Sequence, residues 1–216
     1  MSRRLMGLDR QQRPALVVVE CQNRMTNPAY QDDNRAGLMT QVVSRGIIGR
    51  INTLAAAFRE HGHPVVFATI ALRPGFRGYR VNCVLAAQLV RNGSLVLGEP
   101  AARLNDDLVV EPTDVVSNRM SGMAVFTGTE VDAILRGFGV QTVVLAGVST
   151  NIALPSSACE AVGLGYDVVL AEDCTAGGSE ETHRMQVTMH LPFLATVASS
   201  EQIIARLAAP VARTAS

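Results

Sequence analysis

The chain has 216 residues, of which 48% are hydrophobic, and its 19 basic and 19 acidic side chains cancel at neutral pH. This length and composition suit one α/β domain, which we expect to extend over residues 1–216 with a core at about 14–208. No stretch rich in basic residues is present, so we expect no nucleic-acid partner. The balanced charge favours a small, neutral or singly charged molecule as the partner.

The N-terminal segment has two arginines, Arg3 and Arg4, but no apolar stretch follows them. No run of about eighteen uncharged apolar residues occurs in the sequence, so we expect a cytoplasmic protein with no membrane segment. The four cysteines lie far apart and show no CxxC spacing, which favours reduced thiols over disulfide bonds or a zinc site.

Short apolar segments alternate with amphipathic ones along the chain. The apolar segments, which predict strands, are residues 14–22, 64–70, 114–119, 142–148, 166–173 and 195–199. Helical spacing of apolar residues marks residues 37–62, 82–90, 129–139, the stretch after residue 148, and residues 181–193 and 200–208. Strands that are apolar on both faces and are each followed by a helix predict a doubly wound parallel sheet in three αβα layers.

In such sheets the ligand crevice lies beyond the carboxyl ends of the strands. The candidate site residues are therefore those that directly follow the strands: Glu20, Thr69 to Arg73, Asn118 and Arg119, Val148 to Ala153, and Glu172 to Thr175. The glycine pattern of dinucleotide binding is absent after the first strand, where the sequence reads ECQNRMTNP. We therefore expect no nucleotide cofactor.

Glu20 closes the apolar run VVVE at the crevice end of the first strand. A carboxylate in this place can serve as a general acid or base. The alternative is that Glu20 only pairs with an arginine or caps a loop, and position alone does not separate the two interpretations.

Three stretches together resemble the isochorismatase-like hydrolases: ALVVVECQNRM, FTGTEVDAILRGFGVQTVVLAGVSTN and GYDVVLAEDCTAG. The resemblance extends from about residue 14 to about residue 199. It implies a six-stranded parallel sheet in the order 3-2-1-4-5-6, a cis peptide between Val148 and Ser149, and a homodimer or homotetramer. Most members of this family hydrolyse small amides with an aspartate, a lysine and a cysteine.

The resemblance places different residues at all three of these positions. Glu20 stands for the aspartate and Ala153 for the cysteine, while the lysine position falls near Met120, with Asn118 and Arg119 close enough to be alternatives. We choose Arg119 as the cation because only arginine there has a fixed positive charge. We do not expect Cys21 or Cys159 to replace the missing thiol, because each should point away from the site.

The loop after the second predicted strand contains arginines but no metal ligands. Some family members hold a metal with residues after the second strand, but ATIALRPGFRGYR contains no histidine and no carboxylate, and we expect His183 and His190 to be core or surface residues. Arg73 in that loop is a candidate for binding a substrate carboxylate, and a solvated loop is an equally good interpretation.

Three functional hypotheses follow. The first is a hydrolase without a covalent intermediate, in which Glu20 is the acid/base and Arg119 and the N–H groups of Ser149 and Ala153 hold the oxygen that gains charge, with Asn118 as a further binding residue. The second is an inactive binding or scaffolding protein that keeps the pocket. The third, which we rank last, is an amidohydrolase with a displaced cysteine.

Overall fold

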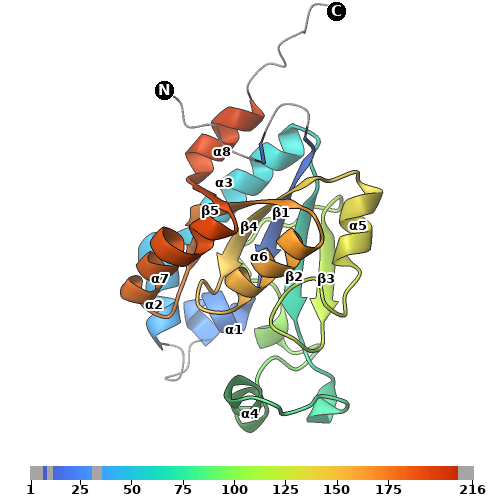
Figure 1. Ribbon diagram of the computed structural model, residues 1–216. Coiled ribbons are helices and arrows are strands. Elements are labelled where there is room, and N and C mark those ends of the chain that lie inside the picture. The colour runs from blue at the N-terminus through green and yellow to red at the C-terminus, as the bar shows by residue number, and fades with distance from the viewer. Residues whose placement is uncertain (1–6, 9–11, 31–35, 209–216) are drawn as a thin grey trace, which may run out of the picture.

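The computed structural model describes residues 7, 8, 12–30 and 36–208, and its centre is a six-stranded parallel sheet (Figure 1). The strands lie in the order β3-β2-β1-β4-β5-β6, which confirms the predicted order. Their bounds are β1 Pro14–Val19, β2 Val65–Ile70, β3 Val115–Arg119, β4 Thr142–Val148, β5 Asp167–Ala176 and β6 Thr196–Ala198. The strands β1, β2 and β4 are buried along their whole length, as their unbroken apolar sequences require.

Helices cover both faces of the sheet. The helices α2 (Ala36–Arg45), α3 (Ile47–Glu60) and α8 (Ser200–Leu207) belong to one layer, and α3 and α8 pack on one core through Ile51, Leu54 and Ile203. The helices α5 (Val131–Gly137) and α6 (Ala153–Gly163) pack on the opposite core through residues such as Leu135 and Leu154. The fold is therefore the predicted three-layer αβα arrangement.

Several element boundaries differ from those predicted. The helix expected over residues 37–62 is two helices, because Gly46 adopts a left-handed conformation (φ 59°) between them. The segment 181–193 is α7 (Glu180–Met185) followed by a π-helical turn (Gln186–His190) and a 3-10 turn (Leu191–Phe193). The first strand ends at Val19 and not at residue 22, because the backbone turns sharply at Glu20.

Two helices lie beyond the carboxyl ends of the strands, at the bottom of the view in Figure 1. These are the short α1 (Asn23–Thr26) and α4 (Val84–Arg91). The remaining 3-10 turns are Pro28–Tyr30, Pro74–Phe76 and Pro100–Ala102. Within the described ranges, no helix is long and apolar enough to cross a membrane.

Candidate active site

A cavity of about 110 Å³ opens beyond the carboxyl ends of the central strands. Its floor comes from the strand ends and from the turn into α6, and its other walls come from α1, α2, α4 and the loops around residues 79, 95 and 122. The lining residues are Glu20, Met25, Leu38, Ile70, Tyr79, Leu85, Leu89, Leu95, Arg119, Gly122, Met123, Val148, Ser149, Ile152 and Ala153. The cavity thus lies where parallel α/β sheets bind their ligands.

Glu20 and Arg119 form an ion pair in this cavity. Arg119 Nη2 donates a charge-assisted hydrogen bond to Glu20 Oε1. The side chain of Arg119 is only 2% exposed and that of Glu20 is 13% exposed. The described residues provide no hydrogen-bond partner for the buried Nε and Nη1 of Arg119. One nitrogen of the guanidinium is therefore paired, and two are left as donors.

The backbone at Glu20 is strained. Its φ of 51° lies in the left-handed region, which non-glycine residues seldom adopt, while its N–H donates to Ala68 O at 2.8 Å. Such strain persists where the surrounding structure enforces it, and it occurs often at functional sites. Here it ends β1 and coincides with the turn of the carboxylate into the cavity.

The pairing of β2 with β3 decides which residue at the end of β3 reaches the cavity. Arg119 lies opposite Ile70, and successive side chains of a strand point to opposite faces. Asn118 therefore points the other way: its amide donates to Ala71 O at 3.1 Å and accepts from Thr69 Oγ1 at 3.0 Å. Of Asn118, Arg119 and Met120, only Arg119 is among the lining residues.

The turn between β4 and α6 forms part of the cavity floor. The peptide between Val148 and Ser149 is cis, as expected, and Ser149, Ile152 and Ala153 line the cavity. The N–H groups of Ser149 and Ala153 have no hydrogen-bond acceptor among the described residues. Ala153 contributes only a methyl group at the first position of α6.

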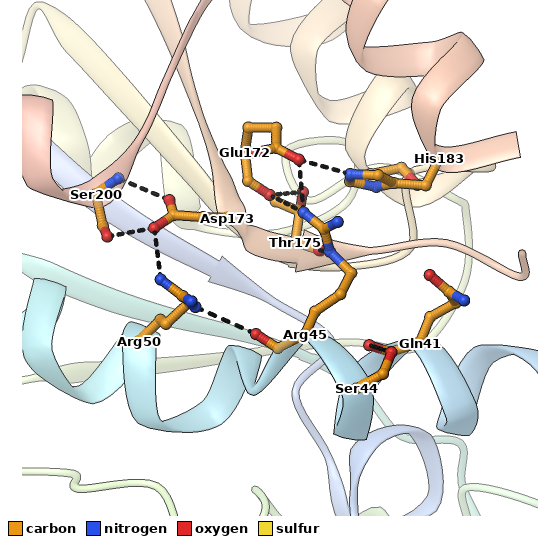
Figure 2. Close-up of polar contacts among 10 residues, drawn as sticks. Gln41, Ser44, Arg45, Arg50, Glu172, Asp173, Thr175, His183 and Ser200 are labelled. Atoms are coloured by element: carbon orange, nitrogen blue, oxygen red, sulfur yellow. Dashed lines mark hydrogen bonds and ion pairs between the residues drawn. The ribbon is translucent and has the colours of Figure 1, made fainter. Parts of the chain in front are cut away.

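A polar network outside the cavity lining joins β5 to α2 and α7 (Figure 2). Glu172 Oε1 accepts from Arg45 Nη2 at 2.5 Å and from His183 Nε2 at 2.9 Å, and Arg45 Nε donates to Thr175 O at 2.9 Å. The hydrogen bond from His183, together with that from Arg45, lowers the pKa of Glu172 to about 2. His183 Nδ1 lies 3.3 Å from the hydroxyl oxygen of Thr150, which is the residue after Ser149.

The order Glu172, His183, Thr150 has the hydrogen-bonding pattern of a hydrolase triad. Thr150, however, has no exposed surface and does not line the cavity, so its hydroxyl is out of reach of a substrate there. A Cβ atom on Gly177 would lie 2.5 Å from Thr150 Oγ1, so the loop after β5 packs directly on the turn. The network therefore supports the turn and does not attack a substrate.

The four cysteines lie outside the cavity lining. Cys21 and Cys174 are buried in the core, where burial raises the pKa of both thiols, that of Cys174 to about 12. Cys159 is exposed on α6, and Cys83 is exposed at the N-terminus of α4, where its sulfur accepts from Ala86 N at 3.5 Å. The expectation that Cys159 and Cys21 do not face the site agrees with these positions.

The sequence predictions missed one polar residue and most of the apolar wall. Tyr79 lines the cavity, and burial raises the pKa of its phenol, which therefore stays protonated at neutral pH as a hydrogen-bond donor. Arg73, from the same loop, is exposed and is not among the lining residues. The apolar spacing of α4, whose Leu85 and Leu89 face the cavity, was the signal that could have revealed this wall.

Among the residues that the structure describes, the histidines and acidic residues do not form a metal-ligand grouping. His183 belongs to the buried network described above, and His190 is exposed and lies 3.3 Å from Gln186 Oε1. Within the described part of the chain, no group of three or more His, Cys, Asp or Glu residues is placed to hold a metal ion.

The structure is thus a doubly wound αβα domain with a charged pair in a cavity at the carboxyl ends of its strands, where such folds bind small molecules. The family model "Isochorismatase domain" matches residues 14–202, and the chain belongs to this family. One relative is YecD of Escherichia coli O157:H7, an uncharacterized isochorismatase family protein. The two sequences are 32% identical over 163 residues, which cover 73% of this chain and 81% of YecD. Another relative is the ureidoacrylate amidohydrolase RutB of Methylobacterium radiotolerans. The two sequences are 31% identical over 190 residues, which cover 78% of this chain and 69% of RutB.

Solved structures of the same fold agree. A cysteine hydrolase from Pseudomonas syringae pv. phaseolicola superposes with a TM-score of 0.77 at 20% identity, covering 96% of this chain and 98% of that one.

Proposed function

We propose that this chain is a hydrolase of a small molecule that works without a cysteine nucleophile, with Glu20 as the acid/base. The observation that carries the proposal is the ion pair of Glu20 with Arg119 in the cavity, held by a strained backbone at Glu20. No other charged side chain of the described residues lines the cavity. Proton transfer at this site is therefore assigned to Glu20, because an arginine stays protonated at any working pH.

The proposed reaction is a direct attack by water. The Glu20 carboxylate accepts a proton as the water oxygen bonds to the electrophilic carbon, and it then gives that proton to the leaving group as the scissile bond breaks. Arg119 and the N–H groups of Ser149 and Ala153 donate to the oxygen that gains negative charge in between. The proton count balances, and no further reactant is needed.

A thiol route is poorly supported for this chain. On the family resemblance Ala153 stands where the cysteine nucleophile is expected, and a methyl group cannot attack a carbonyl. All 19 basic residues of the sequence are arginines, so no lysine is present to assist a thiol. RutB therefore suggests the reaction class, hydrolysis, and not the mechanism.

The second candidate, an inactive binding protein, has one observation in its favour. Glu20 and Arg119 satisfy each other's charge without a substrate, so the pair is also a stable structural feature. Only a turnover measurement separates this candidate from the hydrolase.

The test is a screen of small amides, esters and vinyl ethers with wild type, Glu20→Gln, Ala153→Cys and Cys83→Ser. Proton transfer is worth about 10²–10⁴-fold, so Glu20→Gln should lose activity by that factor. Cys83→Ser should stay active, and Ala153→Cys should not gain amidase activity. The control is Glu130→Gln, which changes an exposed glutamate outside the cavity in the same way.

Each result that contradicts the proposed mechanism supports a different alternative. Activity that survives Glu20→Gln but is lost in Cys83→Ser would support a displaced cysteine. Ligand binding without turnover in wild type would support the inactive binding protein. Cys83 is the thiol tested because it is exposed at the N-terminus of α4, the helix whose Leu85 and Leu89 line the cavity.

Self-association is a further part of the proposal. Met185, Met189 and Phe193 follow at four-residue intervals along α7 and the turns after it and are 40%, 60% and 89% exposed. Exposed apolar side chains of this size support a homodimer or homotetramer. Sedimentation at micromolar concentration should give a species larger than the monomer.

A further inference from the structure

We infer that the cavity selects uncharged ligands that present a single acceptor oxygen, and that Glu20 is the residue that rejects anions. This inference concerns the cavity of the proposed function and rests on that site. It is argued from binding alone, so it does not depend on turnover.

The walls of the cavity determine the size and polarity of the ligand. Ten of the lining residues are Met, Leu, Ile, Val or Ala residues, contributed by α1, α2, α4, the strand ends, the turn into α6 and the loops around residues 95 and 122. Met25, Leu89 and Leu95 among them are buried. A ligand in about 110 Å³ of such surroundings must be small and largely apolar.

Arg119 determines the polar end of the ligand. Its Nε and Nη1 are buried and have no partner among the described residues, and leaving such donors unpaired is costly. In the planar guanidinium these two nitrogens do not lie on the same edge, so an acceptor that binds one of them does not also bind the other. A single acceptor oxygen, such as a carbonyl, can bind either of them, and the phenol of Tyr79 adds a neutral donor.

The negative charge of Glu20 disfavours the binding of an anion. Within the lining, the negative charge of Glu20 cancels the positive charge of Arg119. An anion that binds Arg119 would therefore lie close to a second negative charge in a mostly apolar cavity, where like charges repel more strongly than in water. The arginines nearby in sequence, Arg73, Arg77 and Arg80, are exposed and do not line the cavity, so they do not supply the missing positive charge there.

The same charges predict a reversal of selectivity. Replacement of Glu20 by glutamine removes the negative charge and leaves Arg119 as the only charged group of the described lining. The cavity would then favour an anion over its neutral analogue.

The experiment compares matched pairs that differ in one group: benzamide with benzoate, and isobutyramide with isobutyrate. Titration calorimetry or ligand-detected NMR at pH 7.5, where the acids are ionised, measures their binding to wild type, Glu20→Gln and the control Glu130→Gln. We expect each amide to bind wild type at least tenfold more tightly than its acid. Glu20→Gln should bind the acid at least tenfold more tightly than wild type does, while Glu130→Gln should match wild type.

Three results would overturn the inference: an acid that binds wild type as tightly as its amide, no gain of acid binding in folded Glu20→Gln, or no binding of either member of both pairs. If Glu20→Gln does not fold, the comparison of amide with acid on wild type decides alone. Amide binding without hydrolysis would sink the proposed function and leave this inference standing. Hydrolysis of an anionic substrate that depends on Glu20 would do the reverse.

Discussion

Glu172→Gln is the substitution whose effect on stability can be worked out most fully. In the folded protein the carboxylate accepts from Arg45 and His183, and its pKa falls from 4.5 to about 2. At 1.36 kcal/mol per pKa unit, this corresponds to about 3 kcal/mol. The side chain is 32% exposed, so solvent screening reduces our expectation to about 1–2 kcal/mol.

The sign of the pH dependence follows from the direction of the shift. Because the folded-state pKa lies below the unfolded value, the stabilisation is complete above pH 4.5 and is lost as the pH falls toward about 2. Glu172→Gln should therefore unfold at lower urea than wild type at pH 7, and the difference should shrink steadily between pH 4.5 and pH 3.

Urea unfolding followed by circular dichroism, at one fixed protein concentration, measures both effects. Glu181→Gln, a change of an exposed glutamate near the start of α7, is the matched control and should stay within about 0.5 kcal/mol of wild type. A difference between wild type and Glu172→Gln that is the same at pH 7 and pH 3, or below about 0.5 kcal/mol at pH 7, would refute this account of the network.

Two further predictions concern the strand ends that form the cavity. Gly147→Ala should lower the free energy of unfolding by more than about 3 kcal/mol or prevent folding, because the new Cβ would lie 2.2 Å from Val19 O at a φ of 101°. Gly49→Ala on α3, which has open space around it, should instead raise the free energy of unfolding by about 0.5–1 kcal/mol. Thermal and urea unfolding of both variants check this, and equal stability of the two would contradict it. Arg119→Met should lower the free energy of unfolding by about 3–5 kcal/mol because it leaves the Glu20 carboxylate unpaired. The double variant Arg119→Met with Glu20→Gln should recover a large part of that lost stability. A double-mutant cycle measures the coupling, and a coupling near zero would mean that the ion pair does not form.

The sequence by itself determined the layers and the candidate acid, and its resemblance to the family supplied the strand order. Strands such as PALVVV and TVVLAGV are apolar throughout, and only a parallel sheet covered on both faces buries such segments completely. The crevice rule then pointed to Glu20 and Arg119, because the carboxyl ends of parallel strands lie on one edge of the sheet. Local sequence carries the information on the layers, since the apolar residues of each strand show that both of its faces are buried.

Only the tertiary structure decided what these residues face. The pairing of Glu20 with Arg119 depends on the relative positions of β1, β2 and β3, which are separated by long connections along the chain. Residues from α1, α2 and α4 meet over the strand ends through packing between distant segments, so no local pattern could assign Tyr79 to the cavity or Arg73 to solvent. The link of Thr150 to His183 and Glu172 likewise joins separate elements, because a buried polar group takes whichever partner the fold brings within hydrogen-bond distance.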